Sequence, residues 1–273
     1  YNTGDGSNNN LIKNCQIKEF EEGITLYSSY YNTFENITTQ SSEKGFYLYT
    51  ADHNIFYNIT SESNSNQGIL LYDSENNTFN ETIAKSNENG IQLDGASNAF
   101  LGGTSHESVN EYYMGGSEDT NYFRNTNFTE AREIFFTSQS DYFNYNNHSS
   151  GGVWLNTSID TATENITREL THINRTIVQW NDTSYSAFTA TYGISNLSSD
   201  TYYNVYNNSV LTHTLQTSGR VLPDFSIYLG SEHEIKVREN RGPSSSSTVI
   251  SPIYVNQSQN PSLSGICSDP DGY

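Results

Sequence analysis

The chain is poor in basic residues and contains no long apolar run. Its 12 Lys and Arg are outnumbered by 31 Asp and Glu, which gives a formal net charge of −19 at pH 7. Nucleic acids and anionic membranes bind basic surfaces, so this balance argues against both as partners. A helix that crosses a membrane needs about 18 or more consecutive apolar residues. Because no such run occurs, we expect no membrane span in this chain.

Sulfur-containing and metal-binding residues are also scarce. The chain has two Cys, one Met and six scattered His, which leaves too few ligands for a transition metal, and we expect no cofactor. A structural calcium ion is compatible with the acidic composition, but the neighbouring acids do not match a calcium loop of defined ligand spacing. These pairs are Glu21 with Glu22, Glu118 with Asp119, and Asp269 with Asp271.

The two cysteines, Cys15 and Cys267, stand near opposite ends of the sequence. A disulfide within the chain would need the C-terminal segment to fold back along the whole molecule. A disulfide to another chain, or two unlinked thiols, is therefore favoured over an intrachain bond.

Hydrophobic residues make up only 33% of the chain, which is close to the composition of disordered proteins, yet the sequence repeats. Gly23, Gly45, Gly68 and Gly90 follow one another at steps of 22 or 23 residues, and each begins a stretch of alternating apolar residues. Alternation predicts strands, and the fixed period predicts stacked repeats. A second mark, Asn or Asp followed two residues later by an apolar residue, recurs with the same spacing. It begins at Asn10, Asn32, Asn54, Asn77, Asn98, Asn121 and Asp141.

The repeat predicts an all-β fold whose first part, residues 1–148, is a right-handed parallel β-helix of about seven coils. Each unit is too short for a propeller blade and lacks the Leu-x-x-Leu-x-Leu pattern of a leucine-rich repeat. Stacked coils place equivalent side chains above one another at about 4.8 Å. We expect the Asn of each unit at a bend and the Gly to open a strand at a tight corner. The column expected inside is Phe34, Phe56, Phe79, Phe100 and Phe123.

The repeat ends after Asn147. Residues 149–240 contain short alternating stretches separated by turn residues, which predicts an antiparallel β-sandwich. Residues 241–273 begin with a Pro- and Ser-rich linker and end like the opening strand of a further module. The sandwich strands are expected at Arg175–Trp180, Ser186–Tyr192, Tyr202–Tyr206, Leu211–Thr217, Phe225–Leu229 and Glu234–Val237.

The Gly-Ile-x-Leu and Asn-x-Phe motifs of residues 10–145 resemble the parallel β-helix repeats of the NosD-like family, found in large secreted surface proteins of archaea. The segment from Ile194 to Val237 resembles the immunoglobulin- or fibronectin-like module that commonly follows such repeats. The resemblance implies an extracellular location at the cell surface. It is specific for the fold and says little about function.

Asn-X-Ser/Thr sequons are numerous and predict N-linked glycans as partners. Asn76 and Asn80 begin two of them. Asn36 and Asn58 begin two more, but we expect these side chains in a buried ladder without room for a glycan. The asparagines expected to carry glycans are Asn127, Asn147, Asn156, Asn165, Asn174, Asn181, Asn196, Asn207 and Asn256.

Related β-helix folds include polysaccharide lyases and hydrolases, which need clustered carboxylates with a basic partner on one face. The candidates are Asp52 with His53, Asp73, Asp94 and Arg124, but they do not recur in one column with a basic partner, although Asp73 and Asp94 follow strands at similar places and could face the same side. We therefore expect solvated turn residues and no enzyme. A row of exposed aromatic rings would instead suit a polysaccharide-binding protein. The tyrosines that could form it are Tyr47, Tyr49, Tyr72 and Tyr113.

Together these patterns predict an extracellular structural protein, a subunit of a surface layer, sheath or filament. The alternative is a polysaccharide-binding or polysaccharide-processing β-helix protein. One period before Gly23 is Tyr1, so the sequence opens inside a coil, and we expect copies to join head to tail through the chain ends, with Cys15 and Cys267 linking them. A longer polypeptide whose further segments cap both ends is the other interpretation.

Overall fold

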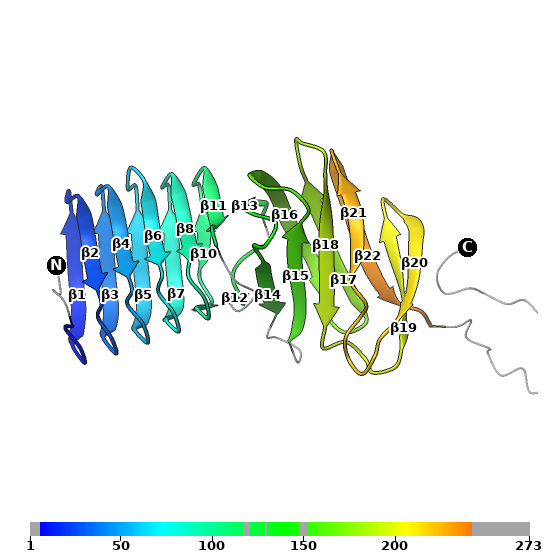
Figure 1. The fold of residues 1–273 in the computed structure, drawn as a ribbon, viewed down its shortest axis with the longest axis horizontal. Coiled ribbons are helices and arrows are strands. Elements are labelled where there is room, and N and C mark those ends of the chain that lie inside the picture. Colours follow the sequence, from blue (N-terminus) through cyan, green and yellow to red (C-terminus); the bar gives the residue numbers. More distant parts are fainter. Residues whose placement is uncertain (1–5, 117–120, 129, 148–151, 242–273) are drawn as a thin grey trace, which may run out of the picture.

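The chain forms an elongated all-β rod built from two long sheets (Figure 1). The computed structural model describes residues 6–116, 121–128, 130–147 and 152–241. Each sheet contains 11 strands, and their inward residues form one continuous apolar core. In these residues no helix is long and apolar enough to cross a membrane.

The first part of the rod consists of parallel strands that alternate between the two sheets. Each of its six turns contributes to both sheets, and equivalent strands of successive turns pair in parallel, as β3 with β5 and β4 with β6. These strands are β1 (Leu11–Lys18), β2 (Glu22–Tyr27), β3 (Thr33–Gln40), β4 (Lys44–Tyr49), β5 (Ile55–Glu62), β6 (Gln67–Tyr72), β7 (Thr78–Lys85), β8 (Asn89–Asp94), β9 (Ala99–Leu101), β10 (Thr104–His106), β11 (Asn110–Met114), β12 (Tyr122–Arg124) and β13 (Arg132–Phe136).

The phenylalanine column lies inside the rod, on the sheet that contains β3, β5 and β7. Each ring stacks on the next with centroid distances between 4.3 and 5.1 Å, and none is more than 1% exposed. The in-register parallel pairing produces this stack, since it places Phe34 opposite Phe56 and Phe56 opposite Phe79. Its members are Phe34, Phe56, Phe79, Phe100 and Phe123.

A buried asparagine ladder runs beside the phenylalanine column. The backbone N and the Nδ2 of Asn54 both donate to Oδ1 of Asn77, at 2.9 and 3.1 Å. Asn54 Nδ2 also donates to the backbone O of Ser29, at 2.9 Å. The same forward pattern connects all six asparagines, so buried backbone groups at the bend are satisfied by the neighbouring turn. The ladder consists of Asn10, Asn32, Asn54, Asn77, Asn98 and Asn121.

The repeated glycines lie at the beginning of their strands, just after a bend, and close packing between turns requires them. Gly23, Gly45, Gly68 and Gly90 are each the second residue of a strand, and none has a positive φ. A Cβ atom on Gly23 would lie 2.7 Å from the carbonyl oxygen of Gly45, and one on Gly68 would lie 2.6 Å from that of Gly90. Any larger residue would therefore push adjacent turns apart.

The parallel part has six turns rather than about seven. The seventh sequence mark leads into β14 (Phe143–Asn147), which pairs in parallel with β12 but antiparallel with the following β15. Asp141 does not continue the asparagine ladder. Its Oδ2 accepts hydrogen bonds from the backbone N of Thr137 and Ser138, both at 2.8 Å, and so closes a turn after β13.

The second half of the described chain is antiparallel and extends the same two sheets. The strands β15, β18 and β21 continue one sheet, and β16, β17, β22, β19 and β20 continue the other (Figure 1). The sequence expectation missed β15 and β16 and placed most of the others within a few residues. The strands are β15 (Val153–Ile159), β16 (Glu164–Ile173), β17 (Ile177–Thr183), β18 (Phe188–Ser195), β19 (Tyr202–Asn207), β20 (Val210–Gln216), β21 (Phe225–Leu229) and β22 (Glu232–Glu239).

A fully buried ion pair lies between the sheets of the antiparallel part. Arg168 Nε and Nη2 donate to the two carboxylate oxygens of Asp182 at 2.8 and 2.7 Å, and Nη1 donates to the Thr157 hydroxyl at 2.8 Å. Trp180 and Tyr192 also donate to Asp182 Oδ2, at 3.2 and 2.7 Å. Burial lowers the pKa of Arg168, but the charge and hydrogen bonds of Asp182 outweigh it, so the net shift is upward. The guanidinium stays charged inside the core.

Candidate functional site

The acids proposed from the sequence do not form a catalytic set with Arg124. Asp73 and Asp94 are brought together, with the backbone N of Asp73 donating to the backbone O of Asp94 at 3.0 Å. Arg124 lies on β12 in the opposite sheet. Asp52 accepts a hydrogen bond from the backbone N of Glu75 at 2.8 Å, and the His53 ring lies 5.1 Å from that of Tyr31. The acidic candidates and His53 therefore lie near one another along one bend of the rod, without Arg124 as a basic partner.

Asp94 is held in an unfavourable environment for a charge. Burial raises its pKa above the usual 3.8, the hydrogen bond from Gln92 lowers it, and the charges of Asp141 and Asp73 raise it further. The net shift is upward, so the folded chain binds the Asp94 proton more tightly than the unfolded chain does. The ionised carboxylate consequently reduces stability above the folded-state pKa.

Replacing Asp94 with Asn should therefore raise the free energy of unfolding modestly at pH 7. The gain should shrink as the pH falls through the folded-state pKa and vanish below about 3.8, where both states of the wild-type carboxyl are protonated. Urea unfolding of both proteins between pH 3.5 and 8 measures this difference. A variant that is less stable than the wild type at pH 7 would contradict the expected sign.

The exposed tyrosines form a stacked column whose ring faces cover one another. Tyr27 and Tyr49 stack at 4.6 Å, and Tyr49 and Tyr72 stack at 5.3 Å with an interplanar angle of 3°. Sequence reasoning missed Tyr27, although its register with Tyr49 is the signal that could have found it. Tyr47 and Tyr113 belong to the neighbouring row. A sugar that stacks on an aromatic residue needs a free ring face, and Tyr49 is covered by a neighbouring tyrosine on both faces.

A small cleft of about 270 Å³ lies on the other sheet and contains Arg124. The guanidinium lies over the Tyr122 ring at 5.3 Å and over the Trp154 ring at 6.0 Å. Gly102 leaves room for the Glu81 carboxylate, because a Cβ there would lie 2.6 Å from Glu81 Oε1. The residues that line the cleft are Asn80, Glu81, Leu101, Gly102, Arg124 and Asn125.

A larger cleft of about 510 Å³ lies where the parallel strands give way to the antiparallel ones. Two of the residues that line it, Asn127 and Asn147, begin sequons. Tyr145 also lines it and donates its hydroxyl to the backbone O of Thr126 at 3.2 Å, and burial raises the pKa of Tyr145 to about 12. The remaining lining residues are Asn125, Thr126, Phe128, Leu170, Thr171, His172 and Ile173.

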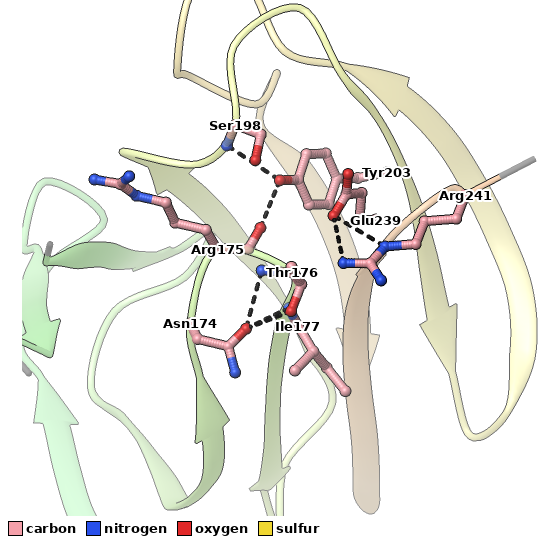
Figure 2. Close-up of polar contacts among 8 residues, drawn as sticks. All are labelled: Asn174, Arg175, Thr176, Ile177, Ser198, Tyr203, Glu239 and Arg241. Atoms are coloured by element: carbon pink, nitrogen blue, oxygen red, sulfur yellow. Dashed lines mark hydrogen bonds and ion pairs between the residues drawn. The ribbon is translucent and has the colours of Figure 1, made fainter. Parts of the chain in front are cut away.

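A third cleft, also about 270 Å³, adjoins β17 and β22 and carries Lys236, Arg238 and Arg241. Figure 2 shows the turn beside it, in which Asn174 Oδ1 accepts hydrogen bonds from the backbone N of Thr176 and of Ile177, both at 2.9 Å. Arg241 pairs with Glu239 at 3.3 Å in the same view. The local positive charge is thus partly neutralised.

The Tyr203 hydroxyl fixes that turn against the loop at Ser198. It donates to the backbone O of Arg175 at 2.6 Å and accepts from the backbone N of Ser198 at 3.1 Å (Figure 2). Tyr203 is fully buried. The turn is therefore part of the framework of the antiparallel strands.

The sequon asparagines differ in whether their Nδ2, the atom that would carry a glycan, is engaged. Asn36 and Asn58 are exposed and not buried as expected, but Asn58 Nδ2 donates to Asn36 Oδ1 at 2.8 Å, and both belong to a surface ladder. Asn147 Nδ2 donates to the backbone O of Ile173 at 3.1 Å, and Asn196 Nδ2 to that of Gly152 at 2.9 Å. Asn256 lies outside the described residues.

The other sequon asparagines of the antiparallel part are placed differently. Asn174 uses its Oδ1 in the turn of Figure 2, and its Nδ2 points away from those partners. Asn207 Oδ1 lies 2.9 Å from the Nδ1 of His233. The Oδ1 atoms of Asn156 and Asn165 are buried without a hydrogen-bond partner. Asn174 is thus placed to carry a glycan.

The calcium and disulfide candidates are only partly described. Glu22 is already engaged, pairing with Lys44 at 3.1 Å and accepting from the Thr25 hydroxyl at 2.6 Å. Within the described ranges, no group of three or more His, Cys, Asp or Glu is arranged to hold a metal ion. Cys15 is partly buried against the core, in register with Ile37. The residues outside the description are Glu118, Asp119, Cys267, Asp269 and Asp271.

The comparison with known families agrees with the repeat architecture. Residues 3–105 match the family model described as the right handed beta helix region. No sequence among the curated proteins matches this chain. Among solved structures, the crystal structure of Dettilon tailspike protein (gp208) aligns at 14% identity over 86% of this chain and 56% of that one, with a TM-score of 0.24. The chain thus spans little more than half the length of that tailspike. With the observed pairing between turns, the family match supports a right-handed parallel β-helix in the first part of this chain.

Proposed function

We propose that this chain is an extracellular structural protein, a rigid rod that serves as subunit of a surface layer, sheath or filament. The observation that supports this most is the continuity of the two sheets, since the parallel turns and the antiparallel strands share both of them. Ladders of buried Asn and Phe connect each turn to the next. A rod stabilised between neighbouring turns suits a load-bearing or spacing role. The NosD-like resemblance, with its archaeal origin and immunoglobulin-like second module, is part of this proposal.

The far end of the rod offers a surface for association with another copy. β20 is the last strand of its sheet in the described chain, and its sequence, from Val210 to Gln216, contains no charged residue and no proline. Charged residues and proline commonly protect an edge strand from pairing with another chain, and β20 lacks this protection. Val210 is 64% exposed and Leu211 is 46% exposed. We therefore place the contact between copies at β20.

Polysaccharide processing is the less favoured function. A hydrolase or lyase needs its acid and its basic partner on one face, and Asp94 and Arg124 lie on opposite sheets. We propose a non-enzymatic role without a cofactor. Incubation with a panel of polysaccharides should release no reducing ends or unsaturated products.

Self-association is tested by replacing Leu211 with Lys, which introduces a charge at the exposed edge. The wild-type chain should form concentration-dependent linear assemblies in sedimentation velocity and electron microscopy, and Leu211→Lys should reduce them strongly. Tyr185→Lys is the matched control, because Tyr185 is 94% exposed and lies between β17 and β18. A wild-type chain that stays monomeric at all concentrations, or assemblies that both variants retain, would contradict the proposed contact.

A further inference from the structure

Arg124 and Glu81 line the same cleft without pairing to each other. Arg124 Nε is buried and has no hydrogen-bond partner, and no ion pair joins the guanidinium to a carboxylate in the described chain. In a chain with 31 acids and only 12 basic residues, an arginine beside an acid would readily form an ion pair. Here the two charged groups stay apart on the walls of one cleft of about 270 Å³.

The aromatic residues behind Arg124 hold it in this position. Tyr122 and Arg124 are two residues apart on β12 and therefore point to the same side of the sheet. Trp154 joins them from β15 through its pairing with Asn146 on β14. The Tyr122 and Trp154 rings pack edge to face at 5.7 Å, and the guanidinium lies over both. Cation–π contacts thus orient the guanidinium but accept none of its hydrogen bonds.

The two walls of the cleft select a neutral ligand. An anion would meet the Glu81 carboxylate, and a cation would meet Arg124. A ligand whose hydroxyl groups both accept and donate hydrogen bonds can satisfy both walls at once. Leu101 adds an apolar contact, and the volume is slightly below the range of about 300–1,000 Å³ typical of drug-sized ligands. The space therefore fits one small ring.

We propose that this cleft binds a neutral sugar ring, whose hydroxyls accept hydrogen bonds from Arg124 and donate to Glu81. This inference goes beyond the structural role and does not depend on it. Two kinds of ligand offer this same hydroxyl chemistry. One is a separate saccharide, and the other is a glycan on Asn80, which lines the cleft and begins the sequon Asn80-Glu81-Thr82.

The first test uses unglycosylated protein and a panel of neutral, acidic and amino sugars, with binding followed by saturation-transfer NMR and titration. Neutral sugars should bind, and Arg124→Gln and Glu81→Gln should each weaken binding about tenfold, as expected for the loss of a charged hydrogen bond. Arg241→Gln, at the exposed pair with Glu239, is the matched control and should leave binding unchanged. Thermal unfolding of each variant shows that it is folded.

The second test uses the chain produced in a host that attaches N-glycans. Glycopeptide mass spectrometry reads the occupancy of Asn80, and enzymatic deglycosylation should then lower the melting temperature of the wild type more than that of Arg124→Gln. If free sugars do not bind but deglycosylation lowers the melting temperature of the wild type more than that of Arg124→Gln, the cleft holds the glycan attached to Asn80. The proposal is overturned if neutral sugars do not bind and Asn80 carries no glycan. It is also overturned if Arg124→Gln does not weaken sugar binding, or if the cleft prefers acidic or amino sugars.

Discussion

Replacing Asp182 with Ala should lower the free energy of unfolding by about 3–5 kcal/mol, because it leaves the Arg168 guanidinium charged and unpaired in the core. Both side chains are 0% exposed, so water cannot replace the lost carboxylate. The same change also removes the acceptor of the Trp180 and Tyr192 donors. Equilibrium unfolding in urea measures the loss.

Two further variants distinguish the cost of leaving a buried charge unpaired from the cost of losing any ion pair. Arg241→Ala removes the exposed pair with Glu239 and should cost no more than about 1 kcal/mol. The double replacement Arg168→Met with Asp182→Leu should be less destabilising than Asp182→Ala alone, because it leaves no buried charge. If Asp182→Ala cost no more than the exposed control, the buried network would not be coupled to folding.

Phe79→Ala should also cost about 3–5 kcal/mol, since it empties a ring-sized space in the middle of the phenylalanine column. Phe79 is fully buried and stacks on Phe56 at 4.3 Å and on Phe100 at 4.7 Å. Neighbouring turns are fixed by the asparagine ladder, so the column has little freedom to collapse into the cavity. Urea or thermal unfolding provides the measurement.

Tyr72→Ala is the matched control for Phe79→Ala. Tyr72 lies in the same turn and stacks on Tyr49, but it is 42% exposed. Its removal should cost clearly less, because much of its surface already contacts water. Equal losses for the two variants would mean that the buried column contributes no more than the surface stack.

The parts of the fold that could be read from the sequence are those that repeat locally. A period of about 22 residues places Phe56 on Phe79 and Asn54 on Asn77 whatever the rest of the chain does. The number of turns was harder to predict from the sequence. Asp141 keeps the spacing of the repeat, but β14 pairs in parallel with β12 and antiparallel with β15. A change from parallel to antiparallel pairing leaves no periodic signal.

The buried ion pair had a signal that sequence reasoning did not use. Arg168 follows Ile166, and Asp182 follows Trp180, each at the inward position of an alternating strand. A charged residue at such a position predicts a buried partner of opposite charge. The cleft at Arg124 had no comparable signal, because Glu81 lies two turns earlier and Trp154 lies beyond the end of the repeat.

The continuity of the two sheets also determines how the molecule would respond to tension. Hydrogen bonds between neighbouring strands point along the rod, because they run perpendicular to the strands and the turns stack lengthwise. A force that pulls along the rod therefore breaks the hydrogen bonds between one pair of neighbouring turns before it loads the next pair. Each turn that opens releases about 70 Å of extended chain in exchange for about 4.8 Å of stacked length. Such a rod can lengthen many times over at nearly constant force, and an intact turn remains as the template on which the next one refolds.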